Sequence, residues 1–227
     1  MDNNEASPMR ASATAGGLFA PHPLLDRIRA DFPAAKFVVV TFARGAWCPF
    51  CHTYALAWQL RQHDVKARGG VVVVVSSQEP AAIPTLWGKA SSAFPEAFSL
   101  PFYVDSGASL GRFLGVVVEA PANPAVTKDY PNGMTQPGVF VLVPVASANQ
   151  TISWRCVVQW THVSKASNLY GASGRVSVQD VIDAYDAVAA SDVQATTTRL
   201  TALNSTTILE VFGGMLKRLL GFAAPYS

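Results

Sequence analysis

Two cysteines stand where a predicted strand turns into a predicted helix. The apolar run 37–42 has strand character, and the segment from Pro49 to about Lys66 keeps its apolar residues on one helical face. Proline suits the first helical position, because its missing N–H has no partner there anyway. This makes Cys48 the expected N-cap and Cys51 the third helical residue. The first turn of a helix has unpaired N–H groups and the positive end of the helix dipole, so we expect a thiolate there, with Cys48 better placed than Cys51.

The predicted elements alternate between strands and helices, which is typical of an α/β protein. The strand 71–75 consists of valine alone, so we expect it to be central and covered on both faces. The cysteines then lie at the carboxyl end of an early strand, where such sheets place their sites. In chain order the patterns predict a helix over 24–32, a strand over 36–42, a helix over 49–66, a strand over 71–75, a helix over 80–93, a strand over 102–104, a helix ending near 114–115, a loop over 119–136, a hairpin of strands over 139–145 and 152–160, and a helix over 178–190.

The chain divides into three parts. Residues 1–17, rich in serine, alanine, asparagine and glycine, predict a disordered leader, and 18–190 predict one domain. Residues 191–227 predict a C-terminal extension with an amphipathic helix. This helix needs cover from its own domain, a second subunit, a partner protein or a membrane surface. Its apolar face holds Ile208, Leu209, Val211, Phe212, Met215, Leu216, Leu219 and Leu220.

The charge balance and the cysteine content limit the partners and the compartment. Lys and Arg number 17 against 15 Asp and Glu, so no basic field points to nucleic acid. The chain starts with acidic and polar residues, unlike a secretory signal, and no apolar run approaches the roughly 20 residues that span a bilayer. Two of the 3 cysteines belong to the motif, which leaves no disulfide framework. We therefore expect a cytoplasmic protein.

The motif around the cysteines resembles a known family. Residues 44–51, Arg-Gly-Ala-Trp-Cys-Pro-Phe-Cys, are similar to the turn of the peroxiredoxin-like branch of the thioredoxin superfamily, the group named after alkyl hydroperoxide reductase and thiol-specific antioxidant. The resemblance implies a thioredoxin-like three-layer fold, with a central mixed sheet flanked by helices, and an antioxidant oxidoreductase that serves cell redox homeostasis. Further similar stretches, which extend the resemblance over roughly residues 20–190, are 75–78, 100–105, 114–116 and 168–172.

The resemblance also bears on which thiol meets the oxidant. A true peroxiredoxin carries Pro-x-x-x-Thr-x-x-Cys, and in that register its peroxidatic cysteine falls on Cys51, its threonine on Cys48 and its proline on Arg44. Two of these three landmarks are absent, so the sequence supports dithiol chemistry and leaves peroxidase activity open. The resemblance further implies that Pro137, which precedes the strand 139–145, is a cis-proline facing the dithiol.

Three neighbours of the cysteines are candidates for supporting roles. Arg44 either acts on the thiolate or a substrate oxygen, or is a solvated turn residue. Trp47 either packs over the dithiol and limits its solvent, or touches the substrate. His52 is expected on the helix surface, where it adds modest positive potential beside the thiols.

Other reactive side chains have simpler interpretations. Cys156 lies inside the alternating strand 152–160, so we expect a core thiol, because free cysteine behaves as a small hydrophobe. Asp105 and Glu119 are either proton carriers for the second thiol or turn and surface carboxylates, and the second case is the commoner one.

We therefore predict a thiol oxidoreductase with a redox-active disulfide between Cys48 and Cys51. One thiolate attacks an oxidised sulfur or a peroxide oxygen, and the other thiol resolves the adduct. A small thiol or a thioredoxin-type protein then reduces the disulfide, and no bound cofactor is required. Homodimer formation or surface docking through the C-terminal helix is expected.

A non-catalytic module is the main alternative. Cys48 and Cys51 would then hold half of an iron–sulfur cluster shared between two chains, or zinc with two further ligands. Neither Cys156 nor His162 has convincing spacing to complete such a site within the chain. The residues from Cys48 to His52 also match the motif for covalent attachment of c-type haem. Attachment of haem requires export of the protein, and the sequence shows no export signal. A buried, vestigial cysteine pair is the remaining interpretation.

Overall fold

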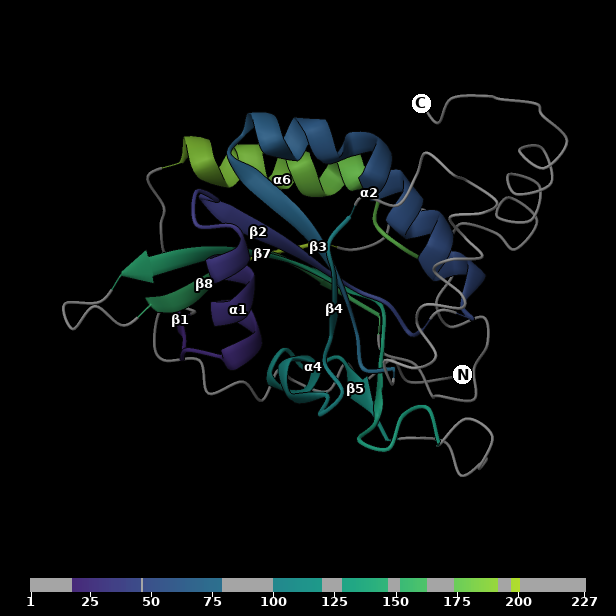
Figure 1. Ribbon diagram of the computed structural model, residues 1–227. Helices are drawn as coiled ribbons and strands as arrows, with labels where there is room; N and C mark the ends of the chain where they lie inside the picture. The colour runs from purple at the N-terminus through teal and green to yellow at the C-terminus, as the bar shows by residue number, and fades with distance from the viewer. Residues whose placement is uncertain are drawn as a thin grey trace, which may run out of the picture.

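A seven-stranded mixed sheet forms the centre of the molecule within the part of the chain that the structure describes (Figure 1). The computed structural model describes residues 18–45, 47–78, 100–119, 128–146, 152–162, 174–191 and 197–200. The strands lie in the order β1-β8-β7-β2-β3-β4, with β9 paired to β8. Their bounds are β1 Leu18–Phe19, β2 Phe37–Phe42, β3 Gly70–Ser76, β4 Phe102–Val104, β7 Gly138–Ala146, β8 Ile152–Thr161 and β9 Thr198–Arg199.

The strands β2 and β3 run parallel through the middle of this sheet. Their register pairs Phe37 with Gly70 at one end and Phe42 with Val75 at the other. The strand β3 is buried along its whole length, as predicted for a run of valines between two layers of helices. On the other side of β2, strands β7 and β8 form the predicted antiparallel hairpin.

Helices cover both faces of the sheet. Alternation along β2 supplies two cores, because Phe37 and Val39 pack on one face while Val38 and Val40 pack on the other. The three-layer α/β fold is therefore confirmed. Figure 1 shows α2 (Pro49–Ala67) and α6 (Val178–Ala190) on the first face, and α1 (Pro23–Asp31) and α4 (Ser109–Phe113) on the second.

One irregularity in β8 changes which face its residues meet. The register against β7 shifts so that Val141 lies opposite Val158 and Leu142 lies opposite Cys156, which leaves Val157 as an extra residue. Cys156 therefore packs in the core with α1 and α4, while Val157 and Val158 pack in the core with α2 and α6. Burial raises the pKa of the Cys156 thiol to about 12. The prediction of a core thiol is confirmed.

The structure also contains short strands that the sequence pattern does not predict. The predicted loop 119–136 ends in β6 (Met134–Thr135), which pairs antiparallel with β5 (Val117–Val118). The strand β9 lies beyond the predicted domain boundary at residue 190, so the sheet continues past that point. A strand of two residues is too short to show a period-two pattern, and only its tertiary pairing reveals it.

Several predicted segments lie outside the described residues. They are the leader 1–17, the helix 80–93, the similar stretch 168–172 and the amphipathic helix around 208–220. Within the residues that are described, no helix combines the length and the hydropathy needed to cross a bilayer.

Candidate active site

The turn between β2 and α2 brings the two cysteines together. Cys48 is the N-cap of α2, with an extended backbone (φ −85°, ψ 107°), and Pro49 is the first helical residue, as predicted. The N–H of Cys48 donates to the carbonyl of Gly45 at 3.1 Å, and the N–H of Cys51 donates to the carbonyl of Cys48 at 3.0 Å. We call this segment the motif turn, and its described residues are Arg44, Gly45, Trp47 and Cys48.

Cys51 is the cysteine that receives hydrogen bonds from the surrounding protein. Its sulfur accepts the backbone N–H of Arg44 at 3.3 Å. It also accepts the Nη2–H of Arg175 at 3.2 Å. Both cysteines are buried, Cys48 at 0% exposure and Cys51 at 3%, so these bonds act in a poorly solvated environment where charge effects are strong.

These contacts set the proton affinities of the two thiols. Burial alone raises the pKa of Cys51, but the hydrogen bond from the Cys48 thiol, the charge of Arg175 and the N–H of Arg44 outweigh it and lower that pKa to about 5. The hydrogen bond that Cys48 makes to Cys51, together with burial, raises the pKa of Cys48 above its ordinary value. Because Arg44 N–H and Arg175 Nη2–H both reach Cys51, the structure favours the lower pKa at Cys51, against the expectation for Cys48. The helix start stabilises a thiolate at Cys48, but this effect is smaller than that of the hydrogen-bond donors from Arg44 and Arg175, which contact the sulfur of Cys51.

Arg175 is held in place by the segment that leads into α6. Its guanidinium carbon lies 4.8 Å from the centre of the Tyr54 ring, and Tyr54 follows Cys51 by one turn of α2. Two residues after Arg175, Ser177 caps α6 in a capping box with Asp180. The sequence pattern misses Arg175, and its only signal is proximity to the similar stretch 168–172.

Arg44 is fully buried, with 0% exposure, so its interpretation as a solvated turn residue is wrong. Its guanidinium carbon lies 5.1 Å from the centre of the Trp47 ring. The backbone of the same residue supplies the N–H that meets the Cys51 sulfur. Arg44 therefore contributes to the site through its main-chain N–H and through the contact of its guanidinium with Trp47.

Trp47 packs against the core that contains both cysteines and is partly buried. Its indole Nε1–H donates to the hydroxyl of Tyr130 at 2.7 Å. Tyr130 is buried, and burial raises the pKa of its hydroxyl, with the charges of the two cysteines adding to that rise. The sequence pattern does not point to Tyr130, because a tyrosine inside a predicted loop carries no local signal.

Pro137 follows β6 and is buried, but its peptide bond is trans, as are all peptide bonds of the described residues. The implied cis-proline is therefore wrong.

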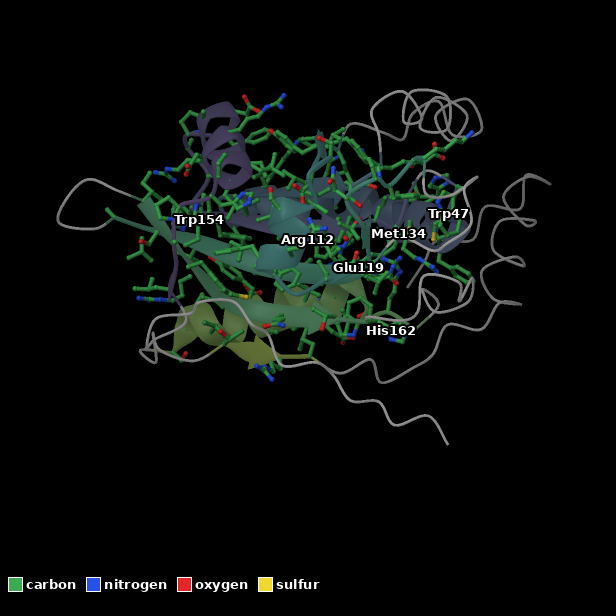
Figure 2. All side chains as sticks on the ribbon, turned by 90° about the horizontal axis from the view of Figure 1, so that it is seen from below. Trp47, Arg112, Glu119, Met134, Trp154 and His162 are labelled. Carbon is green, nitrogen blue, oxygen red and sulfur yellow. The ribbon has the colours of Figure 1, made fainter. Side chains whose placement is uncertain are left out.

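The carbonyl of Pro137 accepts the N–H of His162 at 2.9 Å. Burial and the charges of Arg175 and Arg44 lower the pKa of His162. Figure 2 shows His162 and Trp47 at one end of the molecule, with Trp154 at the other.

The two candidate carboxylates have different surroundings. Asp105 is buried and accepts the N–H groups of Ser109 and Gly111, both at 2.9 Å, so it fixes the start of α4. Glu119 is exposed. These positions match the turn and surface interpretation. On α2, His52 is half-buried, and its charge contributes to the low pKa of Cys51.

Metal ligands are not grouped in the described part of the chain. Across those residues no cluster of three or more His, Cys, Asp or Glu side chains is arranged to hold a metal ion. The described geometry instead offers a nucleophilic sulfur, an adjacent thiol and buried cationic side chains, which is the equipment for thiol–disulfide or thiol–peroxide chemistry.

Comparison with known proteins adds an independent finding. A family model described as Redoxin matches residues 29–144, about half of the chain. No curated protein matches. Similar solved structures include reduced Prx3 from Vibrio vulnificus with hydrogen peroxide (18% identity, covering 75% of this chain and 87% of that one, TM-score 0.47). A second is the bacterioferritin comigratory protein of Xanthomonas campestris (16% identity, covering 70% of this chain and 82% of that one, TM-score 0.45). A third is a mutant PrxQ of Xylella fastidiosa (17% identity, covering 70% of this chain and 81% of that one, TM-score 0.43).

Proposed function

Because the chain belongs to the redoxin family, we propose that it is a peroxiredoxin-like thiol oxidoreductase in which Cys51 attacks the oxidant and Cys48 resolves the product. The match to the family model confirms the predicted family, fold class and class of enzyme. It favours these over the alternative of a metal-binding module. The assignment of the two thiols reverses the order expected from the helix position alone.

With a hydroperoxide as oxidant, the chemistry has two steps at the protein. The Cys51 thiolate attacks the terminal peroxide oxygen, the O–O bond breaks, and the leaving oxygen takes a proton to form an alcohol or water. Cys51 is then a sulfenic acid. The Cys48 thiol attacks that sulfur, the S–S bond forms, and the hydroxyl leaves as water.

One observation carries this assignment: the Cys51 sulfur accepts hydrogen bonds from both Arg44 N–H and Arg175 Nη2–H. Hydrogen bonds to the charged form of a group favour that form, so they hold Cys51 as the thiolate. The Cys48 thiol donates to the same sulfur, which places the resolving group next to it. The peroxiredoxin register, in which Cys51 takes the peroxidatic position, supports the same assignment.

A disulfide is the second class of oxidant. Attack of the Cys51 thiolate on a disulfide sulfur forms a mixed disulfide and releases one thiol, and Cys48 then displaces the second. In either case two electrons must return from outside. We propose a small thiol or a thioredoxin-type protein as the reductant, which supplies two thiols and leaves as a disulfide.

Single cysteine variants test the assignment. Cys51→Ser should lose the reaction with hydrogen peroxide in stopped-flow mixing. Cys48→Ser should still react once and should accumulate a sulfenic acid that a cyclic diketone traps, as seen by mass spectrometry. Cys156→Ser is the matched control, because that thiol is buried away from the site, and it should behave as wild type. The assignment is contradicted if Cys48→Ser loses the first reaction and Cys51→Ser keeps it.

We also propose a cytoplasmic location and an assembly role for the C-terminal helix. Of the 3 cysteines, two belong to the motif, so the chain has no structural disulfide framework, as suits a reducing compartment. The apolar face around 208–220 would bury against a second copy or dock on a partner surface.

A further inference from the structure

The hydroxyl of Tyr130 is built into the motif turn. Tyr130 is 1% exposed and lies 83 residues from Trp47, whose indole N–H it accepts at 2.7 Å. A Cβ atom placed on Gly45 would lie 1.9 Å from the Tyr130 oxygen and 2.9 Å from the Trp47 nitrogen. The hydroxyl therefore occupies the space that a side chain at Gly45 would need, and it contacts both Gly45 and Trp47.

The motif turn in turn carries a donor to the reactive sulfur. Arg44, next to Gly45, places its N–H on Cys51 at 3.3 Å. The guanidinium of Arg44 lies over the Trp47 ring. The bond from Cys48 N–H to the Gly45 carbonyl closes the turn at the start of α2. A displacement of Gly45 or Trp47 would therefore also move the Arg44 N–H relative to Cys51.

Tyr130 is itself fixed to the ends of the central strands. Its carbonyl accepts the N–H of Gly133 at 3.1 Å, and the carbonyl of Gly133 accepts the hydroxyl of Ser77, just after β3, at 2.9 Å. Thr135 in β6 donates its hydroxyl to the carbonyl of Ala43, just after β2, at 2.7 Å. The tyrosine is thus attached to the rigid part of the sheet, which is what a positioning residue requires.

We propose that Tyr130 is a positioning residue that fixes the motif turn through Trp47 and so keeps the backbone N–H of Arg44 on the Cys51 sulfur. This inference rests on the proposed function, in which Cys51 is the attacking thiolate. Tyr130 acts through Trp47 and Arg44, without contact to the reacting atoms. It takes part in setting how acidic Cys51 is and hence how fast Cys51 reacts at low pH.

The variant Tyr130→Phe tests this, because it keeps the ring and removes the hydroxyl. The readout is the rate of Cys51 alkylation against pH, measured with mass spectrometry so that each thiol is followed separately. We call the pH at which the alkylation rate of Cys51 is half of its maximum the Cys51 midpoint. One lost neutral hydrogen bond should raise this midpoint by about half a pH unit to one pH unit. The rate of reaction at pH 5 should then fall by about twofold to fivefold, because half of the wild-type Cys51 is already thiolate at that pH.

Two further variants make the test specific. Tyr103→Phe is the matched control, because Tyr103 is also buried and donates its hydroxyl to Asp31 at 2.7 Å. It should leave the Cys51 midpoint unchanged. Trp47→Phe removes the same hydrogen bond from the donor side, so its shift should match that of Tyr130→Phe. The double variant should shift the midpoint no further than either single variant.

The outcomes separate this inference from the proposed function. A low wild-type midpoint that does not move in Tyr130→Phe, or fully additive shifts in the double variant, contradicts the positioning role alone. A wild-type midpoint in the ordinary range of thiols contradicts the proposed function and this inference with it. If Tyr130→Phe does not fold, Trp47→Phe decides, since an unchanged Cys51 midpoint there overturns the role.

Discussion

Arg175 donates a hydrogen bond to the sulfur of Cys51 at 3.2 Å, although 124 residues separate the two along the chain. The contact joins the start of α6 to the start of α2, across the face of the sheet that both helices cover. It places a buried cation directly on the thiol that we propose as the nucleophile.

Loss of this cation should raise the pKa of Cys51. In Arg175→Ala we expect a rise of about one to two units, because an adjacent opposite charge lowers a thiol pKa by such amounts. Arg175→Lys should retain part of the effect. The measurement is the pH dependence of Cys51 alkylation, with Arg68→Ala as the control, since Arg68 pairs with Asp186 through a separate ion pair. An equal shift in the control would mean that general charge, and not the contact, sets the pKa.

The free energy of unfolding should depend on pH through the same thiol. A thiol whose folded pKa lies below its unfolded value stabilises the fold above the unfolded value, and that contribution is lost as the pH falls through the folded value. For Cys51 this contribution to the free energy of unfolding is complete above pH 9.0 and is lost as the pH falls from 9.0 to about 5. Cys48 has the opposite shift, so its contribution is present below 9.0 and is lost at higher pH.

Under reducing conditions, the stability difference between wild type and Cys51→Ser should therefore increase from pH 5 to pH 9. Urea denaturation at several pH values measures this difference. A difference that stays constant over this range would show that Cys51 titrates alike in the folded and unfolded chain.

Substitution of Gly45 should be costly. In Gly45→Ala the new methyl group would meet the Tyr130 oxygen at 1.9 Å, so we expect a loss of about 1–3 kcal/mol in the free energy of unfolding. Gly107→Ala is the matched control, because nothing lies within 4 Å of its added Cβ. Chemical denaturation of both variants compares them. Equal stability of the two would show that the turn has room to rearrange around Tyr130.

The reaction with hydrogen peroxide should be slow for a redoxin. Arg44 and Cys48 stand where the full peroxiredoxin motif has proline and threonine, so the groups that shape a peroxide pocket are replaced. We expect easier detection of disulfide reduction than of peroxide reduction. Stopped-flow mixing with each oxidant measures both, and a peroxide rate far above that of a free thiol of equal pKa would contradict the expectation.

The C-terminal extension should affect assembly more than redox activity. The described sheet runs to β9, where Leu200 N–H donates to the Gln159 carbonyl at 2.8 Å and Thr197 donates its hydroxyl to the Cys156 carbonyl at 2.8 Å. Truncation after residue 200 should keep a folded, redox-active protein with an altered oligomeric state or solubility. Truncation after 195 removes β9 and should lower the melting temperature as well. Light scattering and thermal unfolding compare both with the full chain, and identical behaviour of all three would contradict a role for the tail.

The sequence predicted the main strands and helices because their patterns are long and local. The valines of β3 indicate a central strand, and Pro49 after Cys48 marks the start of α2. The pKa order of the two cysteines was not predictable, because Arg175 reaches Cys51 only through the packing of α6 against α2. Tyr130 likewise becomes visible only once the loop before β6 lies against the motif turn.

The extra residue at Val157 places Cys156 on the other face of the sheet from Cys48 and Cys51. With strict alternation Cys156 would point the same way as Val158, into the layer that contains Cys48 and Cys51. The bulge turns it to the opposite side, so the thickness of the sheet stands between it and the reactive pair. Cys48 is therefore the one described thiol on the same side of the sheet as Cys51, and we expect repeated turnover to form this disulfide alone.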